Sequence, residues 1–199
     1  MTHGEADTRA KLIDPALHGC GWKEDLIRRE VTDGGIDIVA GTARKQSQGR
    51  IDYTLRLKVA ENSQPVAVAL IEAKAEQYPA THGLQQAKVY GSSKRFNVPF
   101  VFSSNGHEFV EYDNFTGLTY APRPLADFPA PDDLRARYER GMGFSLGSDA
   151  AKPLLVRYPR GEGTRRYYQD AAIRATLEKI VKGGEIMYHL GGRALRCGV

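Results

Sequence analysis

The sequence contains little cysteine and no long hydrophobic run. Its two cysteines, Cys20 and Cys197, lie far apart in the 199 residues and belong to no Cys-x-x-Cys or Cys/His cluster. Neither a disulfide framework nor a structural zinc site is therefore expected. No apolar stretch approaches the length of a membrane span, and the polar start has no signal-peptide core. These absences predict a cytoplasmic protein with no membrane contact.

A phosphate-cradling loop is also missing. The pattern Gly-x-x-x-x-Gly-Lys-Ser/Thr, whose backbone holds the phosphates of ATP, occurs nowhere in the sequence, so we expect the chain not to bind ATP. The composition is ordinary for a soluble globular domain, with 41% hydrophobic and 26% charged residues. The net charge of +4 is compatible with a nucleic-acid partner but does not require one.

The chain centres on a predicted β-hairpin. Residues 50–59 and 66–74 are rich in β-branched, aromatic and aliphatic side chains, and a polar turn with Pro65 separates them. The second segment is almost wholly apolar, as in a strand buried on both faces, until it ends in Glu72-Ala73-Lys74. Folding the hairpin brings Asp52 level with Ala73 to within about one residue.

Two carboxylates and an ammonium group thus converge at one end of the predicted sheet. Burying Asp52, Glu72 and Lys74 together is costly unless the carboxylates bind a cation or pair with the lysine. Loop parity or a bulge decides whether Asp52 shares the face of Glu72, and both options stay open. A strand end with a solvated Glu–Lys ion pair is the alternative interpretation.

Two predicted helices carry further candidates. Residues 5–17 have helical spacing, with a kink or an early end expected near Asp14 because Pro15 follows it. Glu5 and Arg9 lie on one side of this helix. Glu5 is interpreted either as a first-turn residue that favours the helix dipole or as a group that reaches a functional site. A later helix, entered near His82, places Gln86 and Tyr90 on one face.

These residues resemble a known family. Asp52, followed by a hydrophobic strand ending in Glu72-Ala73-Lys74, resembles the core of the PD-(D/E)xK nucleases. Gln86-Ala87-Lys88-Val89-Tyr90 resembles the Gln-x-x-x-Tyr element of the N-terminal nuclease domain of type I restriction enzyme R (motor) subunits. Other segments resemble further landmarks of that domain, in the same order: residues 5–17 with Gly21-Trp22, residues 99–106, Asp113 with Thr116-Gly117, and residues 166–169.

The resemblance implies an α/β restriction-endonuclease-like PD-(D/E)xK fold, with a mixed central β-sheet flanked by helices. It implies that Asp52, Glu72 and the Ala73 carbonyl bind Mg²⁺, which prefers oxygen ligands. Lys74 would then orient or deprotonate the attacking water, or hold the oxyanion, and a pKa lowered beside the metal would suit a base. The residues expected to bind DNA or to support the catalytic groups are Gln86, Tyr90, Glu5 and Arg9.

The resemblance also divides the chain. Residues 1–140 are expected to form the endonuclease domain, residues 141–164 an extended linker, and residues 165–199 a remnant of the start of the helicase/translocase domain of such subunits. Without that domain, apolar side chains of the last helix would be exposed, namely those of Ile173, Leu177 and Ile180. Either the tail 186–190 or a second chain would cover them, and we expect self-association or a loosely ordered end.

The leading hypothesis is a Mg²⁺-dependent endonuclease domain of a type I restriction R subunit. It would hydrolyse phosphodiester bonds of double-stranded DNA and work with the methyltransferase and specificity subunits of a type I restriction complex. The first alternative is a truncated, non-catalytic fragment that binds DNA or a partner without its ATP-driven motor. The second is an unrelated α/β protein in which the Glu–Lys pair is a surface ion pair.

Overall fold

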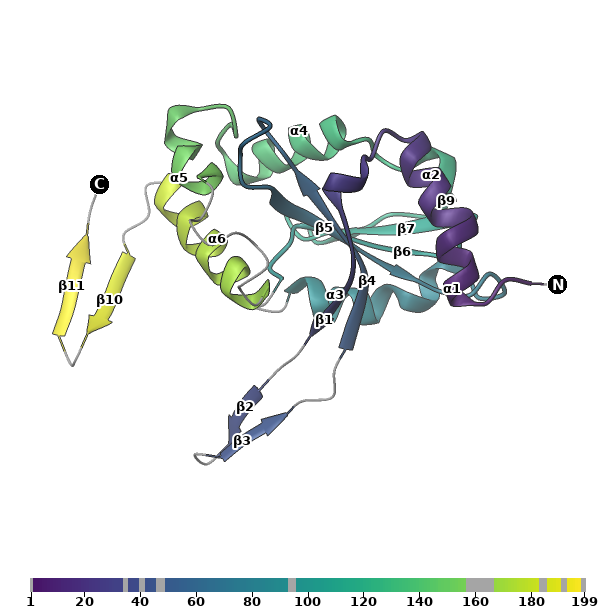
Figure 1. Cartoon of the computed structure of the whole chain (residues 1–199), viewed down its shortest axis with the longest axis horizontal. Coiled ribbons are helices and arrows are strands. Elements are labelled where there is room, and N and C mark those ends of the chain that lie inside the picture. The colour runs from purple at the N-terminus through teal and green to yellow at the C-terminus, as the bar shows by residue number, and fades with distance from the viewer. Residues whose placement is uncertain are drawn as a thin grey trace.

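The computed structural model describes residues 2–33, 36–39, 42–45, 49–92, 96–156, 167–182, 186–190 and 193–197. A seven-stranded sheet forms its centre, in the order β1-β4-β5-β6-β7-β8, with β9 also paired to β7 (Figure 1). The strands are β1 (Ile27–Asp33), β4 (Gly49–Leu57), β5 (Val66–Ala73), β6 (Phe100–Ser104), β7 (Glu108–Asp113), β8 (Leu118–Thr119) and β9 (Arg123–Pro124). β5 and β6 are parallel, and the other pairs are antiparallel.

Helices cover both faces of the sheet (Figure 1). They are α1 (Glu5–Thr8), α2 (Asp14–Gly19), α3 (Leu84–Ser92), α4 (Pro131–Met142), α5 (Lys152–Leu155) and α6 (Tyr167–Val181). α2 and α4 bury Leu17 and Leu134 in a first apolar cluster with Phe102 of β6. α3 buries Ala87 in a second cluster with Val101 of the same strand. Successive strand residues point to opposite faces, so the predicted α/β fold with helices flanking a mixed sheet is confirmed.

β4 and β5 form the predicted hairpin, and a bulge interrupts it. Near the turn, Arg56 of β4 pairs with Ala67 of β5. One residue farther from the turn, Leu55 pairs with Ala69. Val68 is therefore the extra residue on β5, and its side chain is buried in the first apolar cluster. A bulge of this kind shifts the pairing by one residue for the rest of the hairpin.

The N-terminal helix passes Asp14 without ending there. A π-helical segment, Arg9–Ile13, follows α1 and leads directly into α2. The Asp14 N–H donates to the carbonyl of Arg9, five residues back, which widens this turn. Pro15 explains the widening, because its ring has no N–H and would collide with the carbonyl four residues earlier in a regular α-helix. A π-turn thus replaces the predicted kink or early end.

The segment after α4 packs on the core, which differs from the extended linker expected over residues 141–164. α4 ends at Gly143, whose φ of 76° suits glycine. The side chains of Leu146 and Leu154 then return to the first apolar cluster, Leu154 from α5. Residues 157–164 of the predicted linker lie outside the described part of the chain.

α6 is attached to the sheet by buried polar side chains. Arg174 donates from Nη1 to the carbonyl of Ala67 at 2.6 Å and from Nη2 to the carbonyl of Asn97 at 2.8 Å. Glu178, one turn later, accepts a hydrogen bond of 2.6 Å from the Tyr138 hydroxyl of α4. Ala67 is the β5 residue at the bulge, so α6 holds the hairpin at the point where its register changes.

These contacts change the expectation for the end of the chain. The three apolar side chains predicted to be exposed on the last helix are half-buried, and Leu177 packs against the first apolar cluster. The exposed apolar surface on which the expectation of self-association rested is therefore largely covered within the chain. The tail forms β10 (Ile186–Leu190), which pairs with β11 (Arg193–Cys197) in a hairpin that stands apart from the sheet (Figure 1). A further hairpin, β2 (Ile36–Val39) with β3 (Thr42–Lys45), extends beyond β1 and β4 (Figure 1).

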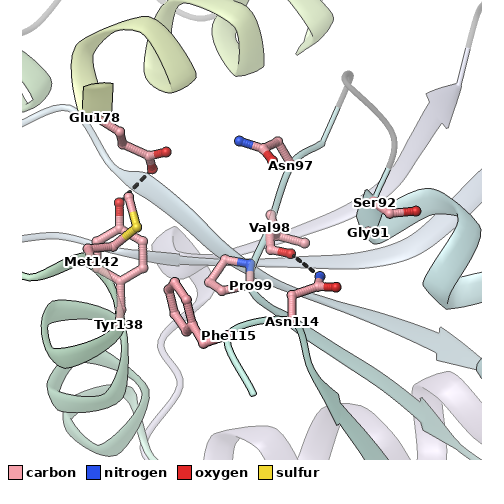
Figure 2. A pocket seen from close by; sticks show the side chains of 10 residues that line it. All are labelled: Gly91, Ser92, Asn97, Val98, Pro99, Asn114, Phe115, Tyr138, Met142 and Glu178. Atoms are coloured by element: carbon pink, nitrogen blue, oxygen red, sulfur yellow. Dashed lines mark hydrogen bonds between the residues drawn. The ribbon is translucent and has the colours of Figure 1, made fainter. Parts of the chain in front are cut away.

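A pocket of about 320 Å³ marks the seam between α6 and the rest of the fold. Figure 2 shows Glu178 and Tyr138 on one side of it, with Val98 and Asn114 on the other. It lies where β6 begins, and none of the predicted site residues lines it. Among the described residues, no helix is both long and apolar enough to cross a membrane.

Candidate active site

The bulge in the central hairpin decides where Asp52 lies. Beyond it, Tyr53 pairs with Ile71, so the next residues outward, Asp52 and Glu72, lie opposite each other. Had the pairing of the turn region continued, Asp52 would face Ile71, and its side chain would point to the other side of the sheet from Glu72. Opposed residues of an antiparallel pair have side chains on the same face. The option left open by the sequence is thus resolved in favour of a shared face.

Both oxygens of the Asp52 carboxylate accept hydrogen bonds. The Ala73 N–H donates to Oδ2 at 2.8 Å, which links the ends of the two strands as the sequence predicted. Arg9 donates from Nη1 to Oδ1 at 3.0 Å, and the π-turn beginning at Arg9 is part of the helix that carries it there. Arg9, predicted as a supporting residue, therefore contacts a predicted catalytic carboxylate directly.

A chain of polar contacts connects Glu72 to the following helix. Lys74 donates to Glu72 Oε1 at 2.7 Å and to Gln86 Oε1 at 3.2 Å. Gln86 in turn approaches the Tyr90 hydroxyl, with 3.5 Å between Nε2 and Oη. α3 follows a 3₁₀ turn, Ala80–Gly83, and so begins beside the end of β5. The structure thus brings together the three predicted catalytic residues and the two predicted on α3.

Burial makes the two carboxylates costly to ionise. Asp52 is 5% exposed and Glu72 is 3% exposed, and Glu72 Oε2 has no hydrogen-bond partner among the described residues. Burial raises the pKa of Glu72 to about 7, against the lowering effect of its hydrogen bond from Lys74. Burial also raises the pKa of Asp52, although the Ala73 N–H and Arg9 oppose this. Such carboxylates gain most from a cation that neutralises them.

Lys74 has a raised pKa in this structure. Burial lowers the pKa of its ammonium group, but the hydrogen bond and charge of Glu72, with the charges of Glu5 and Asp52, outweigh that effect. This direction is opposite to the lowered pKa that would suit a general base, and it favours a protonated Lys74. Glu5, an exposed residue of α1, is near enough for its charge to act on all three groups.

Sequence reasoning gave no site role to Gly83 or Ser103. A Cβ atom on Gly83 would lie 2.7 Å from Ser103 Oγ, 2.9 Å from Glu72 Cγ and 2.9 Å from Lys74 Cε, so three side chains meet against this glycine. Ser103 pairs in register with Glu72 across the parallel β5–β6 ladder, and its buried hydroxyl has no partner in the described part of the chain. The sequence signal for Ser103 is that residues 100–104 begin apolar and end polar. This signal points to the site only once β6 is known to lie beside β5.

The residues at this strand end suit a hard divalent cation. Glu72 Oε2 is an oxygen atom without a hydrogen-bond partner among the described residues, and Asp52 and the Ala73 carbonyl contain further oxygen atoms, which Mg²⁺ prefers to nitrogen or sulfur as ligands. No group of three or more His, Cys, Asp and Glu side chains that could hold a metal occurs within the described ranges. Mg²⁺ commonly uses one or two carboxylates and keeps several waters, so two carboxylates are a sufficient protein contribution.

Known proteins similar to this chain are type I restriction enzyme subunits. No protein-family model matches the sequence. The chain is 31% identical over 192 residues to the endonuclease subunit of the type I restriction enzyme EcoAI from Escherichia coli, covering 90% of this chain. It is also similar to a solved fragment assigned to an HsdR subunit of a type I restriction enzyme from Vibrio vulnificus YJ016, with 31% identity, a TM-score of 0.68 and 92% of this chain covered.

These similarities confirm the resemblance seen in the sequence, in that the homologues are type I restriction enzyme subunits, and they support a restriction-endonuclease-like fold. The chain spans 22% of the length of the curated relative and 33% of the solved chain. The similarity therefore concerns one part of each of these longer relatives.

Proposed function

We propose that this chain is the nuclease part of a type I restriction enzyme R subunit, which hydrolyses phosphodiester bonds of double-stranded DNA with Mg²⁺. The observation that carries the proposal is the pair of opposed, buried carboxylates, Asp52 and Glu72, beside the ammonium group of Lys74. The alternative interpretation of the Glu-x-Lys sequence is a solvated surface ion pair, whose carboxylate would be exposed and not buried. Glu72 is almost fully buried and keeps an oxygen without a partner in the described chain.

Each residue then has a role that follows from its contacts. Asp52, Glu72 and the Ala73 carbonyl would hold Mg²⁺, which neutralises charge on the phosphate and activates a water molecule when bound. Lys74, kept protonated by Glu72, would hold the attacking water or the phosphate oxygen in place. Gln86 accepts a hydrogen bond from Lys74 and so fixes the direction of its ammonium group.

The remaining predicted residues belong to the wider DNA-binding surface in this proposal. Tyr90, one turn beyond Gln86, would face the DNA backbone with it, and Glu5 would adjust the charge of the site. The methyltransferase and specificity subunits of a type I restriction complex are the proposed partners, because the similar proteins are themselves subunits of such enzymes.

The test is a plasmid-nicking assay on the purified chain with and without Mg²⁺. We expect metal-dependent conversion of supercoiled to open-circular DNA, lost in Glu72→Gln and strongly slowed in Lys74→Ala. DNA binding by Lys74→Ala should be nearly unchanged, because one ammonium group among many phosphate contacts contributes little to affinity.

The control variant is Lys152→Ala, which removes an exposed lysine that pairs with Asp149 in a surface contact. It should cleave as the wild type does. If the wild type binds DNA but no metal condition yields cleavage, the chain is instead a non-catalytic DNA-binding fragment. Cleavage that survives Glu72→Gln would contradict the assignment of the site.

A further inference from the structure

Arg9 contacts Asp52 from the N-terminal helix, at a carboxylate that is expected to bind metal. Its Nη1 donates to Asp52 Oδ1 at 3.0 Å, while the other oxygen of Asp52 is held by the Ala73 backbone at 2.8 Å. The Ala73 bond belongs to the strand end and cannot be released without moving β5. The Arg9 bond is made by a long side chain that is 18% exposed. Arg9 is therefore the partner of Asp52 that can move.

A second acceptor for Arg9 is already in place. Its Nη2 donates to Glu30 Oε1 at 3.3 Å, and Arg50 also pairs with Glu30. Glu30 has a φ of 56°, a region that residues other than glycine rarely adopt. The guanidinium group of Arg9 therefore bridges two carboxylates, the buried one of Asp52 and that of Glu30, which is 47% exposed. If Arg9 leaves Asp52, it keeps a partner at the surface.

A divalent cation bound to Asp52 would meet the positive charge of Arg9 at the same carboxylate. Like charges at this distance repel strongly in a partly buried site, where water screens them poorly. The oxygen to which Arg9 donates, Oδ1, is the one that the strand end leaves available. Arg9 and the cation thus compete for one carboxylate.

We propose that Arg9 is a displaceable counter-cation of Asp52, which a divalent metal ion must move toward Glu30 before it binds. The inference rests on the proposed function, since it takes Asp52 as a metal ligand. It assigns Arg9 a role different from simple support of the site. Arg9 lowers the affinity for metal, and it keeps Asp52 paired while no cation is bound.

The test measures Ca²⁺ binding by isothermal titration calorimetry, because Ca²⁺ takes the same oxygen ligands and binding is read without cleavage. Arg9→Gln should bind Ca²⁺ at least about fivefold more tightly than the wild type, the lower range for coupled sites. Asp52→Asn, and Asp52→Asn combined with Arg9→Gln, should both bind Ca²⁺ much more weakly. Thermal unfolding of each variant checks that it is folded.

Two matched variants separate competition from general electrostatics. Lys11→Gln removes the same charge from the same helix at an exposed residue paired with Asp7, and Arg50→Gln removes it from the other partner of Glu30. Neither side chain has a contact to Asp52 in the described structure, so both should bind Ca²⁺ within about twofold of the wild type. The gain of Arg9→Gln should also persist at 1 M ionic strength, where the Debye length is about 3 Å.

The outcomes separate the role proposed for Arg9 from the assignment of the metal site. Unchanged or weaker Ca²⁺ binding by folded Arg9→Gln would overturn the proposal while leaving Asp52 as a ligand, provided that Asp52→Asn still loses binding. An equal gain in Arg50→Gln, or a gain that vanishes in high salt, would also overturn it. Ca²⁺ binding that Asp52→Asn does not weaken, or that no variant shows, would refute both the inference and the metal site.

Discussion

Two pairs of buried carboxylates lie on the described strands of this sheet, and they differ in how completely their oxygens are paired. Glu111 and Asp113 of β7 are 1% and 6% exposed, about as buried as Asp52 and Glu72. Both oxygens of Glu111 are paired, Oε1 with Arg137 and Oε2 with Arg123 at 2.5 Å. Asp113 pairs through Oδ2 with Arg137 at 3.1 Å and through Oδ1 with the backbone N–H of Phe115 at 2.8 Å.

The two pairs differ in the balance of charge and hydrogen bonds around them. The β7 pair has two arginines and a turn backbone as partners, and those partners satisfy all four oxygens. At the hairpin end, Glu72 keeps an oxygen without a partner in the part of the chain that the structure describes, and its pKa is raised to about 7. Buried charges with complete partners are costly to disrupt, whereas incompletely paired ones are typical of sites where binding or chemistry requires them.

Removing a β7 carboxylate should have the largest effect on stability. Glu111→Gln removes the negative charge that Arg137 and Arg123 share and replaces one acceptor oxygen with an NH2 donor, so we expect the free energy of unfolding to fall by about 3 kcal/mol. For a domain of this size that is a melting temperature lower by roughly 10 °C. Glu108→Gln, an exposed residue of the same strand, is the control and should melt as the wild type does. Equal melting of both variants in calorimetry would remove the contrast between the two pairs.

The corresponding change at the hairpin end should act on cleavage instead. Glu72→Gln is expected to lower the rate of metal-dependent DNA nicking by about 100-fold or more, comparable to the loss of one charge-stabilising group in an enzyme site. Without divalent metal its melting temperature should equal or exceed that of the wild type, because the costly buried charge is gone. A variant that fails to fold would show that Glu72 is structural, as Glu111 is.

The pH dependence of stability offers a third comparison. The pKa of Glu72 is about 7 in the folded protein, above the ordinary carboxyl value of about 4.3 in the unfolded chain. A raised carboxyl pKa means that the folded state binds more protons, so its contribution is greatest at low pH and is lost between about pH 4 and 7. Without metal, the wild type should lose on the order of 2 kcal/mol across this range relative to Glu72→Gln. Denaturant titrations at pH 5 and 8 measure the difference, and parallel curves would contradict it.

The smallest predicted effect comes from adding one methyl group. Gly83→Ala should slow cleavage by about tenfold, because its Cβ would press on Glu72, Lys74 and Ser103 and shift the site slightly. Gly19→Ala is a matched control, since an added Cβ there meets no atom of the described structure within 4 Å. DNA affinity should be the same in both variants. A loss of affinity equal to the loss of rate would indicate a disturbed surface instead of a displaced site.

Several elements were predictable from local sequence alone. The hairpin, the buried character of β5 and the helix with Gln86 and Tyr90 follow from patterns within each segment, and the structure contains them. The grouping of Asp52, Glu72 and Lys74 came from the length of the hairpin, although their catalytic roles remain predictions.

Other features depend on contacts that no local pattern encodes. The bulge at Val68 has no local signal, because the β5 sequence around it is uniformly apolar. The attachment of α6 depends on hydrogen bonds from Arg174 to the backbone carbonyls of Ala67 and Asn97, which lie 107 and 77 residues away in sequence. Ile173, Leu177 and Ile180 were expected to be exposed on that helix, whereas they are half-buried, and among its described side chains burial is greatest at Arg174 and Glu178.

The bulge at Val68 also limits how this hairpin can change. Sequence drift that adds or removes one residue in most surface hairpins alters only the turn. Here, loss of the extra β5 residue would bring Asp52 opposite Ile71 and place the two carboxylates on opposite sides of the sheet. One-residue length changes between Ala67 and Glu72 are therefore tolerable only when a second change compensates for them. An alignment of functional relatives should therefore preserve the number of residues in this part of β5 along with the carboxylates themselves.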